Sequence, residues 1–210
     1  VMLFCMVFML YPRASISAKR IMAVLNTETS IENHPGNAQT DSGSGEHSVI
    51  FEHVDFVYPD GEEAVLKDIS FSAKSGETVA FIGSTGSGKS SLIQLIPRFY
   101  DRASGNIYID GQKIEDLDIN ALRSKIGFVQ QKAHLFSGTI EENIRFGKPD
   151  ATMDEIIHAA KIAQAYDFIM EKPHQFQEQI VEGATNVSGG QKQRLTIARA
   201  LIRKPEIYIY

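Results

Sequence analysis

The sequence has few of the residues that cross-link small secreted domains, and few of the charges that hold nucleic acids. Cys5 is the only cysteine among 210 residues, which excludes a disulfide framework within the chain and fits a reducing compartment. The 21 basic residues are outnumbered by 26 acidic ones, giving a net charge of −5. Because phosphate backbones bind to basic faces, this balance argues against nucleic acid as a partner. The 6 histidines show no metal-ligand spacing, so none is assigned to a site.

Long apolar runs are scarce too, and the one present lies at the start of the sequence. Residues 1–12 read VMLFCMVFMLYP, shorter than the roughly 20 apolar residues that span a membrane. Basic residues follow from Arg13, and Glu28 is the first acidic residue, the charge order found on the cytoplasmic side of a membrane helix. We therefore predict that residues 1–32 hold the end of a transmembrane helix and its cytoplasmic extension. A buried helix of a soluble domain is the alternative, and a signal peptide fits less well because no basic residue precedes the run.

The rest of the sequence divides into a linker and one domain. Residues 33–46, NHPGNAQTDSGSGE, contain no large apolar side chain and are rich in Gly, Ser and Asn, as is typical of a linker. Residues 47–210 then form a domain, and an apolar content of 43 % over the whole sequence is enough for a sizeable core.

Strand-like and helical segments are mixed within this domain. Residues 49–56 and 66–73 have the spacing of half-buried strands, and residues 78–82, TVAFI, form the short apolar run of a strand buried on both faces. Residues 139–172 read mainly as helices, and a further strand begins at Ile207. The pattern predicts an α/β fold.

A phosphate-binding loop follows the TVAFI run. The segment GSTGSGKSS fills every fixed position of the pattern G-x-x-x-x-G-K-[ST]. Glycines let backbone N–H groups turn around phosphate oxygens, the lysine places a positive charge on the β- and γ-phosphates, and the serine hydroxyl can ligate Mg²⁺. A chance match of a Gly/Ser-rich loop is the alternative, but a strand before the loop and a helix after it favour nucleotide binding. The predicted nucleotide-binding residues are Gly83, Ser84, Thr85, Gly86, Ser87, Gly88, Lys89, Ser90 and Ser91.

A second helix start with the same chemistry lies about a hundred residues later, in NVSGGQKQRLTIARALIRKP. Taken alone, Ser188-Gly189-Gly190 is a turn or a helix cap, since serine is a good N-cap. A serine and two glycines opening a helix also make an anion site. The chain therefore has two predicted phosphate-binding helix starts.

Together these motifs resemble the ATP-binding cassette (ABC) family, with VSGGQKQR similar to its signature motif and Val187 standing where leucine is usual. The resemblance implies a P-loop NTPase cassette with a RecA-like core, an antiparallel β subdomain and a helical subdomain. It also implies ATP and Mg²⁺ as cofactors, and head-to-tail pairing of two cassettes. Each ATP then lies between the phosphate loop of one chain and the signature of the other. The signature residues expected to act on the partner's ATP are Val187, Ser188, Gly189, Gly190 and Gln191.

Further positions match the family. Tyr58 matches the aromatic residue that stacks on adenine, and a core aromatic at a strand end is the alternative. Gln131 matches the glutamine that reaches Mg²⁺ and the attacking water. Gln130 is the alternative, but the spacing V-x-Q favours Gln131. Ser90 and Gln131 are thus the implied metal ligands. The segment LFSGTIEENIRFG resembles the start of the exporter helical subdomain that faces the membrane domain, and Glu182 resembles the acidic residue of the loop before the signature.

The start of the sequence resembles the end of the last membrane helix of ABC exporters. This implies a membrane-bound half-transporter whose cassette is cytoplasmic, which pairs with a second half-transporter and exports a drug, lipid or peptide. The family's catalytic Asp and Glu, and its later His, follow the strand that begins at Ile207, and none of them stands at residues 207–210. We therefore expect a cassette truncated before its carboxylates, inactive as an ATPase by itself although its parent hydrolyses ATP. The alternative is a degenerate, non-hydrolysing half of a heterodimer.

Overall fold

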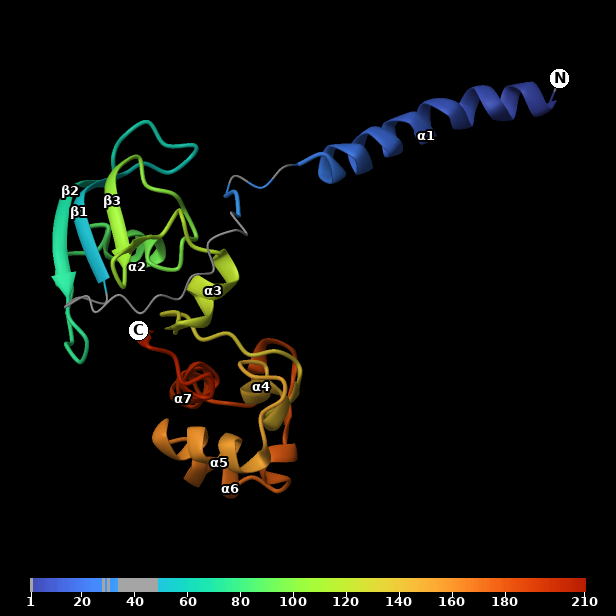
Figure 1. The fold of residues 1–210 in the computed structure, drawn as a ribbon. Helices are drawn as coiled ribbons and strands as arrows, with labels where there is room; N and C mark the ends of the chain where they lie inside the picture. Colours follow the sequence, from blue (N-terminus) through green and yellow to red (C-terminus); the bar gives the residue numbers. More distant parts are fainter. Residues whose placement is uncertain (1, 28, 30, 34–48) are drawn as a thin grey trace. The chain divides into compact units, whose positions relative to one another are not determined.

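The structure is a computed structural model that describes residues 2–27, 29, 31–33 and 49–210 (Figure 1). The chain separates into two compact units, Val1–Glu32 and Asn33–Tyr210. Apart from Asn33, the predicted linker 33–46 lies outside the described residues.

The first unit contains one helix, α1 (Met2–Leu25), with Pro12 inside it. The apolar side chains described in this helix are largely exposed, with Val24 at 75 % and Leu25 at 70 %. Within the described ranges, no helix combines the length and the apolar character needed to cross a membrane.

The second unit opens with an antiparallel sheet in the order β2-β1-β3-β4. Its strands are β1 (Val49–Phe56), β2 (Leu66–Ala73), β3 (Ser104–Ile109) and β4 (Gln112–Lys113). The side chains of Val49, Phe51, Val54 and Phe56 are buried, as the apolar spacing predicts. The pairing register of β1 with β2 and with β3 shifts after residue 51. His53, which has a positive φ, forms a bulge there.

The strand predicted at residues 78–82 is wrong for this structure. In the described chain these residues have no strand partner, and Ile82 is 95 % exposed. The parallel part of the fold is instead a two-stranded sheet of β5 (Ile126–Phe128) and β8 (Ile207–Ile209). An apolar run becomes a strand only where another strand receives its backbone hydrogen bonds, and no described strand lies beside this one. The strand predicted to begin at Ile207 is confirmed, with Ile209 buried at 6 % and Tyr208 43 % exposed.

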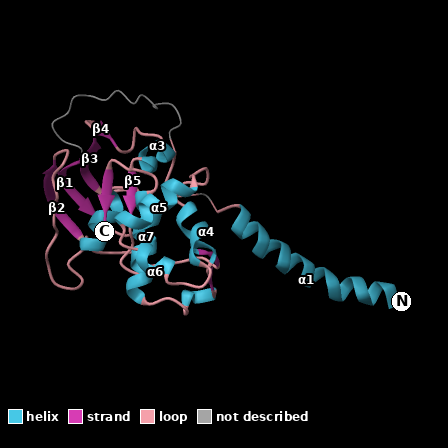
Figure 2. Cartoon of the chain, turned by 90° about the horizontal axis from the view of Figure 1, so that it is seen from below, coloured by secondary structure: helices cyan, strands magenta, loops and turns pink. Residues whose placement is uncertain are grey.

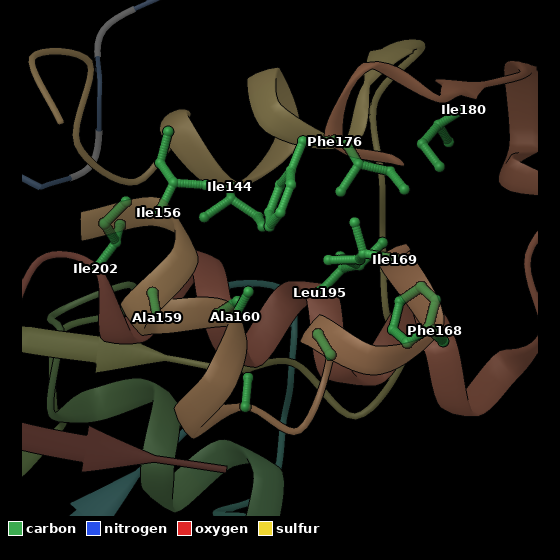
Figure 3. Packing of buried hydrophobic residues seen from close by; sticks show 14 of the residues in the cluster. Ile144, Ile156, Ala159, Ala160, Phe168, Ile169, Phe176, Ile180, Leu195 and Ile202 are labelled. Carbon is green, nitrogen blue, oxygen red and sulfur yellow. The ribbon is translucent and has the colours of Figure 1, made fainter. Parts of the chain in front are cut away.

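Two hydrophobic clusters form the core of the second unit. One joins the antiparallel sheet to α2 (Lys89–Leu95), α3 (Ile119–Ser124), β5 and β8. The other is the helical part (Figure 3), which confirms the helices predicted for residues 139–172. Its elements are β6 (Gly138–Thr139), α4 (Ile140–Arg145), α5 (Met153–Ile162), α6 (Tyr166–Met170), η1 (Gln175–Gln177), β7 (Gln179–Ile180), η2 (Glu182–Ala184) and α7 (Gly189–Leu201).

Helix capping and the packing of α7 hold the helical cluster together. Helix α7 packs against both α4 and α5 (Figure 2). Thr139 and Thr152 each form a capping box with the glutamate three residues on, which fixes the starts of α4 and α5. Leu195 and Ala198 place the buried face of α7 in this cluster. The two predicted anion-binding helix starts, those of α2 and α7, therefore belong to different packing clusters.

Candidate nucleotide-binding site

Residues 83–91 form a loop that enters the first turn of α2 and folds around Lys89. The Lys89 Nζ donates hydrogen bonds to the carbonyl oxygen of Gly83 at 2.8 Å and to that of Ser84 at 2.7 Å. It also donates to the Ser87 Oγ at 3.1 Å. All three acceptors are neutral oxygens, and a phosphate would offer the ammonium group charged ones, which make stronger hydrogen bonds. The cation of the motif is thus held by contacts that a nucleotide can replace.

Two glycines of this motif are required by the packing of the loop. Gly88, the N-cap of α2, has φ of +84°, a conformation that costs a residue with a side chain about 1–2 kcal/mol. A Cβ at Gly88 would also lie 2.7 Å from the Cδ2 of Leu66. A Cβ at Gly83 would lie 2.7 Å from the Ser87 Oγ, one of the oxygens that holds Lys89. A side chain at Gly88 would therefore strain the backbone, and one at Gly83 would displace the Ser87 hydroxyl that holds Lys89.

Ser90 and Ser91 begin α2 with opposite exposures. The Ser90 side chain is exposed beside Lys89, as an Mg²⁺ ligand must be, and a hydroxyl oxygen suits the preference of that ion. Ser91 is buried, and its Oγ shares a hydrogen bond of 2.8 Å with the OH of Tyr58. Of the two serines, only Ser90 is free to face a metal ion.

Tyr58 is a half-buried aromatic residue just beyond β1. Its ring packs edge-on against Phe56, with centroids 4.7 Å apart, and against Tyr100 at 5.1 Å. Through Ser91 it also contacts the helix that carries the phosphate loop. Tyr58 is therefore both a core aromatic at a strand end and a neighbour of the predicted nucleotide site, and its stacking on adenine stays a prediction.

Gln130 and Gln131 lie in an exposed segment directly after β5. The Val129 N–H donates to the carbonyl oxygen of Ile209 at 2.8 Å, so the pairing of β5 with β8 continues up to the two glutamines. Gln130 lines a groove on the helical part, described below, and Gln131 does not. The assignment of Gln131 to Mg²⁺ and water stays a prediction, as does that of Ser90.

The signature segment begins α7 with a capping box. The Ser188 Oγ accepts a hydrogen bond from the Gln191 N–H at 3.3 Å, and the Gln191 Oε1 accepts one from the Ser188 N–H at 2.9 Å. Val187 anchors this turn, because its side chain is 6 % exposed within the helical cluster. A Cβ at Gly189 or at Gly190 would meet no atom of another segment of the described chain within 4 Å. The start of α7 is therefore a rigid turn with free space in front of its two glycines.

The loop before the signature is tied to α7 by Lys192. Its Nζ donates to the carbonyl oxygen of Gly183 at 3.1 Å. Gly183 and Ala184 both have positive φ, +71° and +52°. Glu182 starts this turn and is exposed, so its resemblance to the family's acidic loop residue is compatible with the geometry.

An open groove of about 410 Å³ lies between β5 and the helical part. Its walls include apolar side chains of Phe99, Phe128, Phe136 and Phe146, and basic ones of Arg123, Lys132 and Arg199. The lining of this groove contains no acidic residue of the described chain. The groove therefore suits an apolar segment that carries negative charge.

Sequence reasoning missed two residues that organise this region, Asn143 and Arg199. Asn143 is 2 % exposed, and the Arg199 guanidinium donates to its Oδ1 at 2.8 Å. Burial lowers the pKa of Arg199 below its usual value, although a guanidinium stays charged at neutral pH. The sequence did offer one indication of Asn143, an asparagine within the helix-like segment EENIR. Asparagine is disfavoured in helix interiors unless its side-chain amide makes hydrogen bonds.

Comparison with known proteins places this geometry in a family. The model of the family described as "ABC transporter" matches residues 66–210. An uncharacterized ABC transporter ATP-binding protein, YfiB of Bacillus subtilis (strain 168), is 47 % identical over 207 residues, which cover 99 % of this chain and 35 % of YfiB. A putative multidrug export ATP-binding/permease protein of Staphylococcus aureus (strain NCTC 8325) is 52 % identical over 161 residues, 77 % of this chain and 28 % of that protein.

A solved structure agrees. A bacterial Atm1-family ABC exporter with ATP bound superposes with a TM-score of 0.86 at 34 % identity, over 97 % of this chain and 35 % of that one. The sequence thus spans about a third of the length of these relatives. With the phosphate loop, the signature turn and the family match over residues 66–210, the chain belongs to the ABC transporter family and contains an exporter-type ATP-binding domain.

Proposed function

We propose that this domain binds and hydrolyses ATP as part of an exporter and couples that cycle to export of a drug, lipid or peptide. The observation that carries the proposal is the pair of helix starts in one chain. One start holds Lys89 in a loop of neutral oxygens, and the other is a capped turn with open space at Gly189 and Gly190. Because they belong to different packing clusters, each is free to serve a different nucleotide.

In the proposed site, ATP replaces the internal acceptors of Lys89. The ammonium group then binds the β- and γ-phosphates, and Tyr58 lies beside the adenine. Ser90 and Gln131 are the residues that would hold Mg²⁺, which when bound neutralises charge on the phosphates. Both side chains are exposed oxygen donors, the type that this ion prefers.

The signature turn of one chain completes the site of a second chain. Ser188 to Gln191 face the γ-phosphate that the partner's phosphate loop holds, so two half-transporters, identical or different, share two sites. The carboxylate base that the family resemblance implies is not among residues 207–210, IYIY. We therefore expect the 210-residue chain by itself to bind ATP without turnover.

The groove beside β5 supports a membrane partner. An apolar, acidic segment of a membrane domain on the cytoplasmic side suits its phenylalanine and basic walls. The whole protein is then membrane-bound, and residues 1–32 are the end of its last membrane helix with its extension. The relatives named for multidrug export and ABC export support the exporter part of this proposal.

The test uses the full-length gene product that contains these residues, purified in lipid. We expect Mg²⁺-dependent ATP hydrolysis, and loss of ATP binding by at least about tenfold in Lys89→Ala, because one charged hydrogen bond is worth roughly 1.5–3 kcal/mol. Lys67→Ala, which removes an exposed lysine of β2, is the matched control. ATP binding without hydrolysis would favour the degenerate half-transporter, and unchanged binding in Lys89→Ala would refute the site.

A further inference from the structure

Arg199 lies in the last turn of α7, the helix that Ser188 caps, and it reaches back to two earlier segments. Its Nε donates to the carbonyl oxygen of Asn143 at 2.8 Å and its Nη2 to the Asn143 Oδ1 at 2.8 Å. Its Nη1 donates to the carbonyl oxygen of His134 at 2.9 Å. One side chain therefore joins α7 to α4 and to the segment that follows Gln131.

Asn143 completes this network from inside the helical cluster. Its Nδ2 donates to the carbonyl oxygens of Phe136 at 2.8 Å and Thr139 at 3.0 Å. Its Oδ1 accepts from the Phe136 N–H at 2.9 Å as well as from Arg199. Both donor hydrogens and both acceptor positions of the amide are thus used. A buried network with every member satisfied holds its parts in one arrangement.

Packing reinforces the same link. The Arg199 guanidinium carbon lies 5.0 Å from the ring centroid of Phe136 and 5.8 Å from that of Phe146, within cation–π range. A side chain at Gly147 would collide with the Arg199 carbonyl oxygen, so the end of α4 lies directly on the α7 backbone. Residues 134–136, α4 and α7 are therefore held together through Arg199 and Asn143.

We propose that Arg199 is a positioning residue that ties the loop after Gln131 to α7 and thereby fixes how the signature turn meets the partner's ATP. This inference rests on the proposed head-to-tail function. His134 is three residues from Gln131, and Ser188 is eleven residues, roughly 16 Å of helix, from Arg199. A regular helix of that length transmits a tilt at one end to the other.

The test asks at which of two nucleotide sites Arg199 acts. Two differently tagged full-length copies are co-purified as mixed dimers, and Lys89→Ala removes ATP binding from one copy. Retention of labelled ATP after rapid desalting then reports the remaining site. In the first dimer, Arg199→Gln is on the Lys89→Ala copy, so the altered signature faces the remaining ATP. In the second, Arg199→Gln is on the other copy, so its own phosphate loop holds that ATP.

We expect retention to be about tenfold shorter in the first dimer and unchanged in the second, a size typical of coupling within one network. Both dimers carry the same two substitutions, so a general loss of stability affects them equally. Equal losses would overturn the proposal in favour of a structural role. A loss only in the second dimer would mean that Arg199 acts on its own chain's ATP, and no loss in either would exclude the coupling.

Two further variants keep the test decisive. Arg199→Lys keeps the charge near Phe136 but loses the planar fork, so we expect a loss of retention intermediate between wild type and Arg199→Gln, and this variant serves if Arg199→Gln fails to fold. Lys172→Gln is the control, because the Lys172 side chain makes no hydrogen bond or ion pair with the described residues and lies outside the groove, and retention should match wild type.

The proposed function is checked separately in the same format. Ser188→Arg on the Lys89→Ala copy places a bulky cation in the signature that faces the remaining ATP. If that dimer retains ATP as wild type does, the head-to-tail site itself is wrong. If it loses ATP while both Arg199 dimers retain it, the head-to-tail site stands and only the Arg199 coupling fails.

Discussion

Replacing Asn143 with alanine tests the buried network without reference to any ligand. The substitution removes four hydrogen bonds, two with Phe136, one with Thr139 and one with Arg199. A neutral hydrogen bond contributes about 0.5–1.5 kcal/mol and a charged one about 1.5–3 kcal/mol. Since water can re-satisfy some partners of a small truncation, we expect a loss of about 3–5 kcal/mol in the free energy of unfolding.

The assay is urea denaturation monitored by circular dichroism. The wild-type and variant proteins are compared under the same conditions. The midpoint should fall while the slope stays unchanged, because the substitution alters stability and not the area exposed on unfolding. Asn120→Ala is the matched control, since Asn120 is an exposed helical asparagine in α3. It should change stability by less than about 0.5 kcal/mol. A loss below about 1 kcal/mol for Asn143→Ala would refute the reasoning that this network is fully formed and buried.

Three further predictions concern the nucleotide site and α3. Gly88→Ala should destabilise the protein by about 2–4 kcal/mol, from the left-handed backbone and the collision with Leu66; a thermal shift near zero would contradict the loop geometry. Tyr58→Phe should cost about 1 kcal/mol through the lost Ser91 hydrogen bond yet keep ATP affinity within twofold, measured by calorimetry; a large affinity loss would argue against ring stacking as its role. Hydrogen bonds from the Ala121 N–H, and then from Asn33, lower the pKa of Asp118. The carboxylate therefore stabilises the fold above the usual carboxyl pKa, and that contribution is lost as pH falls through the lowered pKa. Melting curves of wild type and Asp118→Asn should thus differ at pH 7 and begin to converge only as the pH falls below about 4; a constant difference would exclude this linkage.

The sequence by itself determined the parts of this protein whose physics is local. The phosphate loop and the signature turn were readable because glycine, lysine and serine at fixed spacing serve one chemistry. Strands β1 and β2 were readable from their apolar spacing, and the start of α7 from the N-cap preference of Ser188. The residues near each element set its preferred conformation, although strands β1 and β2 also needed each other's hydrogen bonds.

Only the tertiary structure decided the features that depend on distant partners. The TVAFI run of residues 78–82 has strand composition but no described strand beside it, so its backbone is not paired. Asn33, at the edge of the predicted linker, accepts the Ile119 N–H at 3.0 Å and so helps to cap a helix 86 positions later. Arg199 meets His134 and Asn143 only after the helical cluster has formed. Sequence spacing carries no record of such contacts, because they arise when separate elements pack and satisfy one another's polar groups.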